Sequence, residues 1–398
     1  MRFPDIRLLD SIPLEIPVRF ACALLTLAAF PSLALAADPP ATPLPEGPVT
    51  DAAEVPSAAE IEAARQRGID YLRTSQNDDG SWTAKEPLGI TAIAAVSLIE
   101  SGLPTDDPTV AKALKHVAAA AKPDGGIYVE GSPHRNYETA LSLMALARVP
   151  GDEYADEIKG ARAFLKELQW DAGEGIDEDD VRWGGAGYGG GGERPDLSNT
   201  QFLVEALKAS GSGPDDEAIQ KALVFVTRTQ NLEGHGNDTP NASKINDGGF
   251  YYTPALGGQT KAGTTPNGGL RSYASMTYAG LKSMIYAGLT KDDPRVKAAR
   301  DWASKHYTLT QNPGMGLQGH YYYIQTLAKT LNTLGGDTLT DADGVEHPWR
   351  DDVAAQLIAM QRENGSWVNE ADRWYEGDPN MITAFSLLAL SDAVPPKK

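Results

Sequence analysis

Polar and aromatic side chains recur just before, or at the start of, segments that read as Ala- and Leu-rich helices. Carboxyl, imidazole and phenol groups transfer protons in enzymes, and guanidinium groups bind acidic ligand groups. Helix N-termini that open into one mouth also favour an anionic ligand group there. The sequence therefore gives twelve candidate ligand-binding residues: His134, Arg135, Tyr137, Glu138, Asp196, Asn199, Arg271, Tyr273, His320, Tyr321, Tyr322 and Asp378.

Some of these residues also suit a purely structural role. Asp196 and Asn199 have the side chains of helix N-caps, and so do four threonines at positions 91, 139, 277 and 383. Three tryptophans, at positions 82, 183 and 367, are expected in the core. The tyrosines at 251, 252, 321, 322 and 323 cannot all face a core, because they run along the chain.

A repeat supplies the elements that would position the candidate site. A helix pattern, a Gly-rich turn and a second apolar helix pattern recur six times, most clearly from Gln76 to Trp82 and from Gln361 to Trp367. The fifth copy, around Trp302, is degenerate. A unit of this size cannot bury its apolar face alone and must stack on its neighbours. Six stacked pairs can close a ring, so we predict an all-α (α/α)6 toroid over residues 58–392.

A second set of turns alternates with the first and divides the chain into twelve helices. Glycine suits the left-handed residue after a helix, and Asp followed by Pro starts the next one. The segments lack the period-two alternation of strands, which argues against a β-propeller. The inner helices are predicted at residues 91–101, 139–147, 199–210, 275–287, 323–334 and 382–391.

The Gln-to-Trp repeats with an interposed Gly-Ser-Trp resemble those of squalene–hopene cyclases, oxidosqualene cyclases and protein prenyltransferase β subunits. The resemblance covers roughly residues 58–392 and identifies the chain as a divergent, exported relative. It implies a toroid whose central cavity takes an isoprenoid or another apolar ligand.

Both chemistries of the resembled family lack a key residue here. In the cyclases, an Asp-x-Asp-Asp-Thr segment opens an inner helix, and its middle aspartic acid protonates the polyene. The matching residues are 196–200, where Ser198 replaces that acid, and a hydroxyl is too weak to protonate an alkene. The prenyltransferases hold zinc with Asp, Cys and His, but the only cysteine is Cys22. We therefore predict no metal and no cofactor.

Long insertions are predicted to frame the site on one rim. The chain takes 31 residues from Gln169 to Thr200 and 47 from Gln230 to Thr277, and such loops commonly carry binding residues. The acidic run 177–180 lies in the first of them. It reads as a solvated loop or a weak calcium site.

Charge and the N-terminus bear on partners and location. The net charge of −19 argues against nucleic acid and anionic membrane surfaces as partners. Arg19 precedes an apolar run over residues 20–36 that ends in an Ala-x-Ala site, which predicts a signal peptide cleaved near Ala36. We expect an exported, periplasmic or extracellular protein without a membrane span; an uncleaved membrane anchor is the alternative. Residues 37–57 read as a Pro/Ala-rich linker and 393–398 as a tail.

Three functional classes remain open. The first is a toroid that binds or processes a small apolar ligand, as the resemblance implies. The second is a carbohydrate-active enzyme similar to polysaccharide lyases, which abstract a proton with Tyr, His or Arg. The third is a noncatalytic toroid that binds a protein partner. The cavity wall discriminates between the first two, since aromatic and aliphatic walls favour terpenoids and a polar trough favours glycans.

Overall fold

The computed structural model describes residues 55–83, 88–189 and 194–394, all within one compact unit. The predicted signal peptide, most of the predicted linker and the end of the predicted tail lie outside the described residues. Within the described ranges, no helix is long and apolar enough to cross a membrane.

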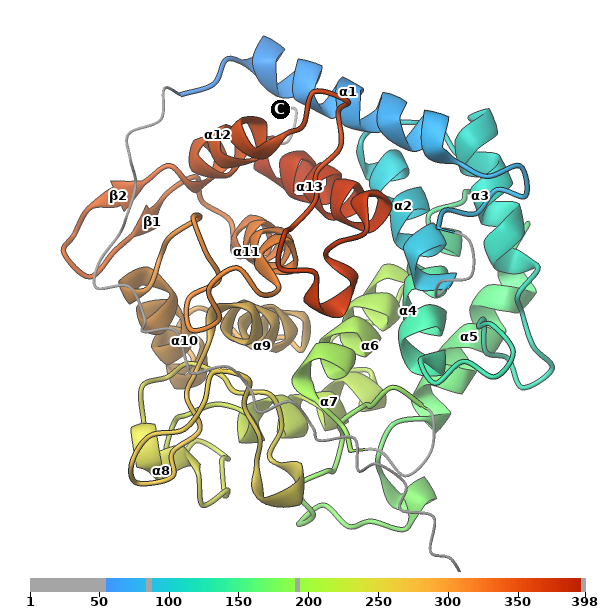
Figure 1. Ribbon diagram of the computed structural model, residues 1–398. Helices are drawn as coiled ribbons and strands as arrows, with labels where there is room; N and C mark the ends of the chain where they lie inside the picture. The colour runs from blue at the N-terminus through green and yellow to red at the C-terminus, as the bar shows by residue number, and fades with distance from the viewer. Residues whose placement is uncertain (1–54, 84–87, 190–193, 395–398) are drawn as a thin grey trace, which may run out of the picture. The chain divides into compact units, whose positions relative to one another are not determined.

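Twelve helices alternate around a closed ring (Figure 1). Each inner helix packs against the inner helices before and after it, and α13 packs against α2. The predicted all-α toroid is therefore confirmed. The outer helices are α1 (Ala58–Ser75), α3 (Pro108–Ala118), α5 (Ala155–Glu167), α7 (Glu217–Arg228), α10 (Pro294–Lys305) and α12 (Trp349–Met360). The inner helices are α2 (Leu88–Glu100), α4 (Arg135–Leu146), α6 (Leu197–Ala209), α9 (Ala274–Tyr286), α11 (His320–Leu334) and α13 (Pro379–Ala393).

Little other regular structure occurs in the described residues. A short helix, α8 (Ala242–Ile245), and three 3-10 turns lie in the loops. The only strands of the described ranges, β1 (Leu339–Thr340) and β2 (Glu346–His347), pair antiparallel in a hairpin before α12. The 3-10 turns span Ala172–Glu174, Ala255–Gly257 and Arg373–Tyr375.

The repeated glutamine joins neighbouring helix pairs. Its side-chain amide donates one hydrogen bond to its own Gly turn and another to a backbone carbonyl in the N-terminal half of the next outer helix in the ring. The last of these glutamines, Gln361, donates to Ala64 of α1, so the last helix pair is tied to the first. The acceptors are Gly80 and Thr109 for Gln76, Gly184 and Ala218 for Gln169, Gly248 and Arg295 for Gln230, and Gly365 and Ala64 for Gln361.

Glycine is needed in these turns for two reasons. Gly184 has a φ of +77°, which disfavours other residues, and a Cβ there would lie 1.8 Å from the carbonyl oxygen of Lys221 in α7. Gly80 and Gly365 also have positive φ and pack against the next outer helix in the ring. The turn tryptophans are buried, as predicted, and the Nε1 atoms of Trp82 and Trp367 donate to backbone carbonyls of α1 and α12.

One structural interpretation of the sequence, the set of proposed N-caps, needs correction. The threonines are not N-caps: they lie within the first turns of the inner helices and accept hydrogen bonds from the Gly turns, as Thr91 does from the backbone N–H of Trp82. Among the residues proposed as N-caps, only Asp196 caps a helix, α6. In the degenerate fifth copy, Trp302 lies on the outer helix α10, and its Nε1 donates to Asp247 in the preceding repeat.

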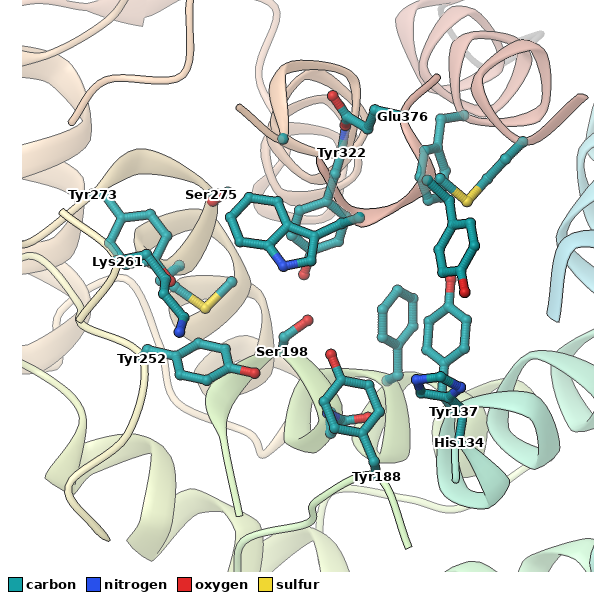
Figure 2. Close-up of a pocket in the computed structure, with 18 of the residues that line it drawn as sticks. His134, Tyr137, Tyr188, Ser198, Tyr252, Lys261, Tyr273, Ser275, Tyr322 and Glu376 are labelled. Atoms are coloured by element: carbon teal, nitrogen blue, oxygen red, sulfur yellow. The ribbon is translucent and has the colours of Figure 1, made fainter. Parts of the chain in front are cut away.

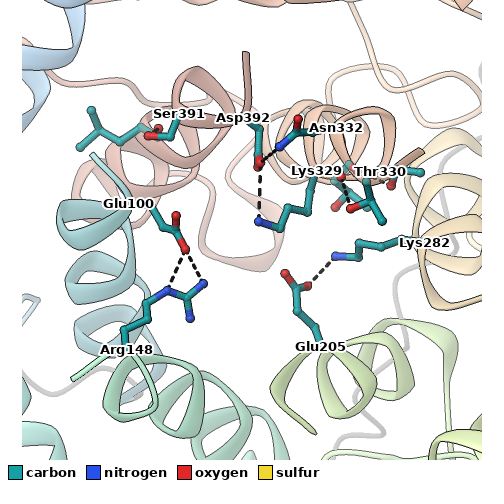
Figure 3. A network of polar contacts seen from close by, with 12 residues as sticks. Glu100, Arg148, Glu205, Lys282, Lys329, Thr330, Asn332, Ser391 and Asp392 are labelled. Atoms are coloured by element: carbon teal, nitrogen blue, oxygen red, sulfur yellow. Dashed lines mark hydrogen bonds and ion pairs between the residues drawn. The ribbon is translucent and has the colours of Figure 1, made fainter. Parts of the chain in front are cut away.

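The ends of the inner helices opposite the predicted site carry a ring of ionisable side chains (Figure 3). Arg148 pairs with Glu100 at 2.6 Å, and the buried Lys282 pairs with Glu205 at 2.5 Å. Burial acts to raise the pKa of Glu205, but the nearby lysines, Lys282 first, bring it below its ordinary value. A third ion pair, between Lys329 and Asp392 at 3.5 Å, completes the ring. Three cationic side chains thus neutralise three carboxylates at this end.

Candidate functional site

The central cavity opens at the N-terminal ends of the inner helices (Figure 2). Its volume is about 200 Å³, more than tenfold the roughly 10–15 Å³ that one water molecule needs. It is therefore large enough for a small molecule. Nineteen residues line it: Ile90, His134, Tyr137, Tyr188, Ser198, Asn199, Phe202, Tyr252, Lys261, Tyr273, Ser275, Met276, Gly319, Tyr322, Trp374, Tyr375, Glu376, Met381 and Phe385.

Aromatic rings form a continuous part of the wall. Phe202 on α6 contacts Tyr137 on α4 edge-on, with ring centroids 5.2 Å apart, and lies 6.1 Å from the ring of Tyr322 on α11. Tyr322 in turn lies 6.2 Å from Phe385 on α13. Four inner helices thus supply one connected aromatic surface, which fits apolar ligand surface.

The phenol groups of this wall remain protonated. Burial raises the pKa of Tyr137, Tyr273 and Tyr322, and their proximity to other tyrosines or acidic groups raises it further. The pKa of Tyr252 is raised by burial and by Asp196. These hydroxyls can therefore donate hydrogen bonds to a ligand oxygen, but they are poorly suited to act as bases.

Asp196 organises the start of α6 from behind the wall. It accepts hydrogen bonds from the backbone N–H and the side-chain amide of Asn199, both at 2.9 Å. Burial raises the pKa of Asp196 to about 6, although the hydrogen bonds from Asn199 and Tyr252 act to lower it. Asn199 and Ser198 line the cavity, so the Ser198 hydroxyl lies at its wall.

Glu376 is the only carboxyl group among the residues that line the cavity. It accepts a hydrogen bond from the backbone N–H of Tyr322, at 2.8 Å, and another from the side-chain amide of Asn369, at 2.6 Å. Burial raises its pKa to about 7, although these bonds act in the other direction. The group is therefore a weak acid near neutral pH.

The structure divides the predicted site residues into two groups. Five line the cavity: His134, Tyr137, Asn199, Tyr273 and Tyr322. The other seven do not: Arg135, Glu138, Asp196, Arg271, His320, Tyr321 and Asp378.

The residues away from the cavity have structural contacts. Glu138 accepts hydrogen bonds from the backbone of Val129 and the hydroxyl of Ser132, and Asp378 caps α13. His320 donates through Nε2 to a backbone carbonyl at 2.8 Å. These side chains do not line the cavity, because a residue near a helix start can point along the rim or into the neighbouring turn as easily as inward.

Sequence reasoning missed several loop residues of the cavity. Tyr188 comes from the loop before α6, Lys261 from the loop before α9, and Trp374, Tyr375 and Glu376 from the loop before α13. The length of the first two loops was a signal for this rim, but it does not indicate which side chain turns inward.

The acidic run 177–180 is not part of the cavity. Asp180 pairs with Arg182 at 2.6 Å, and its backbone carbonyl accepts a hydrogen bond from Arg228. In the described ranges, no group of three or more His, Cys, Asp or Glu residues is arranged to hold a metal ion.

Comparisons with known proteins show similarity at the level of the fold. No family model matches the chain, and no curated protein matches it in sequence. Among solved structures, the type II terpene cyclase MstE from Scytonema is 15% identical, covers 85% of this chain and 99% of its own, and has a TM-score of 0.51. A variant of the same enzyme, in complex with geranylgeranyl dihydroxybenzoate, is 14% identical, covers 84% of this chain and 97% of its own, and has a TM-score of 0.53. The glycoside hydrolase family 76 mannosidase Bt3792 from Bacteroides thetaiotaomicron is 12% identical, covers 83% of this chain and 98% of its own, and has a TM-score of 0.50. The chain therefore has the toroid fold of terpenoid cyclases, which other α/α toroid enzymes share.

Proposed function

We propose that the protein binds a small, largely apolar, isoprenoid-like ligand in the central cavity. The observation that carries this proposal is the wall itself: nine of the nineteen lining residues are Phe, Tyr or Trp. Ile90, Met276 and Met381 add aliphatic surface. Burial of apolar ligand surface against such a wall is favourable by about 25 cal/mol per Å². The tyrosine hydroxyls can orient one polar group of the ligand.

Acid-initiated cyclisation is not part of the proposal. Protonation of an isolated alkene needs a strong acid in a dry site, and Ser198 cannot provide one. Glu376 lines the cavity, but its pKa of about 7 makes it a weaker acid than an ordinary carboxyl group. Any processing of the ligand would have to begin from a more reactive group than an alkene.

The likeness to MstE supports a ligand in this position only through the fold. That enzyme has been solved with geranylgeranyl dihydroxybenzoate, which joins a long apolar chain to a polar ring. A ligand of this general kind would place its chain against the aromatic wall and its polar group against the phenols.

A carbohydrate ligand is the second candidate, favoured by two exposed aromatic side chains. Trp374 and Tyr375 line the cavity yet are 42% and 46% exposed, and sugar rings stack on such surfaces. The lyase form of this candidate is weaker, because burial raises the pKa of the cavity tyrosines and so disfavours a phenolate base. The third functional class, a noncatalytic toroid that binds a protein partner, does not require a ligand cavity, so the cavity does not favour it.

We also propose that the protein works outside the cytoplasm, after cleavage near Ala36, without nucleic acid as a partner. N-terminal sequencing of the protein recovered from cells tests this. A chain that begins at Ala37 supports export, whereas an intact N-terminus in the membrane fraction supports the anchor.

Titration of purified protein with geranylgeraniol, followed by calorimetry, tests the ligand class. We expect saturable binding with one ligand per chain and a negative heat-capacity change, the mark of apolar burial. Mannan oligosaccharides serve as the comparison. Binding of the oligosaccharide but not of geranylgeraniol would replace the first candidate with the second, and binding of neither would remove both.

A further inference from the structure

Two consecutive aromatic residues at the mouth of the cavity have a backbone conformation that suits glycine. Trp374 and Tyr375 have φ values of +60° and +66°. In this left-handed region Cβ approaches the following carbonyl oxygen, so large side chains rarely adopt it. Strain of this kind persists only where the surroundings impose it, and it concentrates at ligand-binding sites.

Hydrogen bonds near both ends of the segment 369–378 impose this left-handed backbone conformation. The backbone N–H of Asn369 donates to the carbonyl of Glu376 at 2.9 Å, and the Asn369 side chain donates to the carbonyl of Leu317 at 2.7 Å. The Glu376 carboxyl group accepts the backbone N–H of Tyr322 on α11. The segment is thus fastened to the start of α11 before it enters α13.

Arg373 and Gly319 position the tryptophan ring within this frame. The Arg373 guanidinium lies 4.4 Å from the centre of the Trp374 ring and donates to the side chain of Gln318 at 2.7 Å. A Cβ at Gly319 would lie 3.4 Å from the ring, so the ring packs over this glycine. The indole therefore has a fixed place at the mouth.

Burial within the protein does not explain why aromatic residues occupy these two positions, because Trp374 and Tyr375 are each more than two fifths exposed. Glycine at both positions would remove the left-handed backbone strain. The hydrogen bonds that hold the segment would remain, because they are made by other side chains and by the backbone. The rings would bury further surface only when a ligand fills the mouth beside them.

We propose that Trp374 and Tyr375 form a mouth clamp that contacts the outer end of a long apolar ligand and so selects its length. The inference rests on the proposed function, since it assumes an apolar occupant whose inner end lies against Phe202 and Phe385. Glu376 and Arg373 are positioning residues: they hold the clamp and need not touch the ligand. A ligand too short to reach the mouth gains nothing from the clamp.

The test compares glycine variants at three left-handed positions in the whole protein. Trp374→Gly and Tyr375→Gly remove the clamp. Leu256→Gly is the matched control, because Leu256 also has a positive φ, +55°, and is 77% exposed, but does not line the cavity. Calorimetry measures the affinity for geranylgeraniol and for geraniol, which has half its chain length, and thermal unfolding measures Tm.

We expect Tm to fall by no more than about 5 °C in all three variants, because relief of the left-handed strain offsets the lost contacts, which for Trp374 are those with Gly319 and Arg373. Affinity for geranylgeraniol should fall by about tenfold or more in the two clamp variants and stay unchanged in Leu256→Gly. Affinity for geraniol should fall by less than about threefold in any of them. This combination separates a ligand contact from a structural one, since a structural ring would lower Tm when removed.

Three results would overturn the clamp. These are an unchanged affinity for geranylgeraniol in both clamp variants, equal losses for the long and the short prenol, and a Tm lowered by more than about 5 °C. Each leaves the proposed function standing, provided that the wild type binds geranylgeraniol. If the wild type binds neither prenol, the proposed function itself fails.

Discussion

The side-chain amide of Gln361 donates a hydrogen bond of 2.9 Å to the backbone carbonyl of Ala64, a residue 297 positions earlier in the chain. The same amide also bonds the carbonyl of Gly365 in its own turn. The contact repeats the link that the other glutamines make between neighbouring pairs, and here it joins α12 to α1. One short motif thus links neighbouring helix pairs at four places in the ring, and the link made by Gln361 closes it.

Removal of this link should destabilise the whole ring. We expect Gln361→Ala to lower the free energy of unfolding in urea by about 1–3 kcal/mol, because two carbonyl oxygens lose their donor. Gln66→Ala is the control: this glutamine lies on the exposed face of α1 and bonds only Asp70 in the described structure. Equal stability of the two variants would show that the closing bonds contribute nothing.

The Gly turns predict a difference between two glycines with similar backbones. Gly151 has a φ of +86°, and a Cβ there would meet no atom within 4 Å, whereas a Cβ at Gly184 would meet the Lys221 carbonyl. Gly151→Ala should cost about 1–2 kcal/mol from backbone strain alone. Gly184→Ala should cost clearly more, because α5 and α7 must separate or the turn must move. Comparable urea midpoints for both variants would contradict this packing.

The ring was predictable from sequence, whereas much of the cavity was not. The Gln, Gly and Trp signals are local, recur in register and act through neighbouring backbone, so their spacing alone identifies them. Glu376 shows the limit. It follows two exposed aromatic residues in a short polar loop, and only the fold of that loop over α11 buries its carboxyl group. Local patterns cannot show which loop crosses the mouth, and the first turn of a helix does not fix which side chain faces inward.

The buried carboxyl groups predict how stability depends on pH. The pKa of Glu376 is raised to about 7 by burial, so between about pH 4 and 7 the folded state holds a proton that the unfolded state has lost. The free energy of unfolding should therefore fall as pH rises through this range. Asp196, with a pKa of about 6, acts in the same direction.

A comparison with Glu376→Gln isolates the contribution of one group. Urea unfolding at pH 5 and pH 8 should show a stability loss smaller in Glu376→Gln than in the wild type, by on the order of 2–3 kcal/mol. The glutamine keeps a hydrogen-bond acceptor for Tyr322 and does not titrate. Parallel losses in the two proteins would mean that Glu376 ionises normally in the folded state.

The chemistry at the start of α6 predicts that the protein does not cyclise squalene. In the sequence match to the cyclase motif, Ser198 replaces the acid, and in the structure Asp196 caps α6. Incubation with squalene in detergent, followed by gas chromatography, should yield no polycyclic product. A product that disappears in Asp196→Asn would restore a cyclase assignment. Loss of product in Asp179→Asn instead would identify the acidic loop as the proton donor.

The most direct test of the account blocks the cavity itself. Ser198→Phe places a ring into the space between Tyr322 and the α6 start, whereas Ser391→Phe adds the same ring at the opposite, charged end of the barrel. Calorimetric titration with geranylgeraniol should show an affinity reduced by about tenfold or more in Ser198→Phe and unchanged in Ser391→Phe, with both proteins folded by circular dichroism. Unchanged affinity in Ser198→Phe, or a loss confined to Ser391→Phe, would contradict binding in the aromatic cavity.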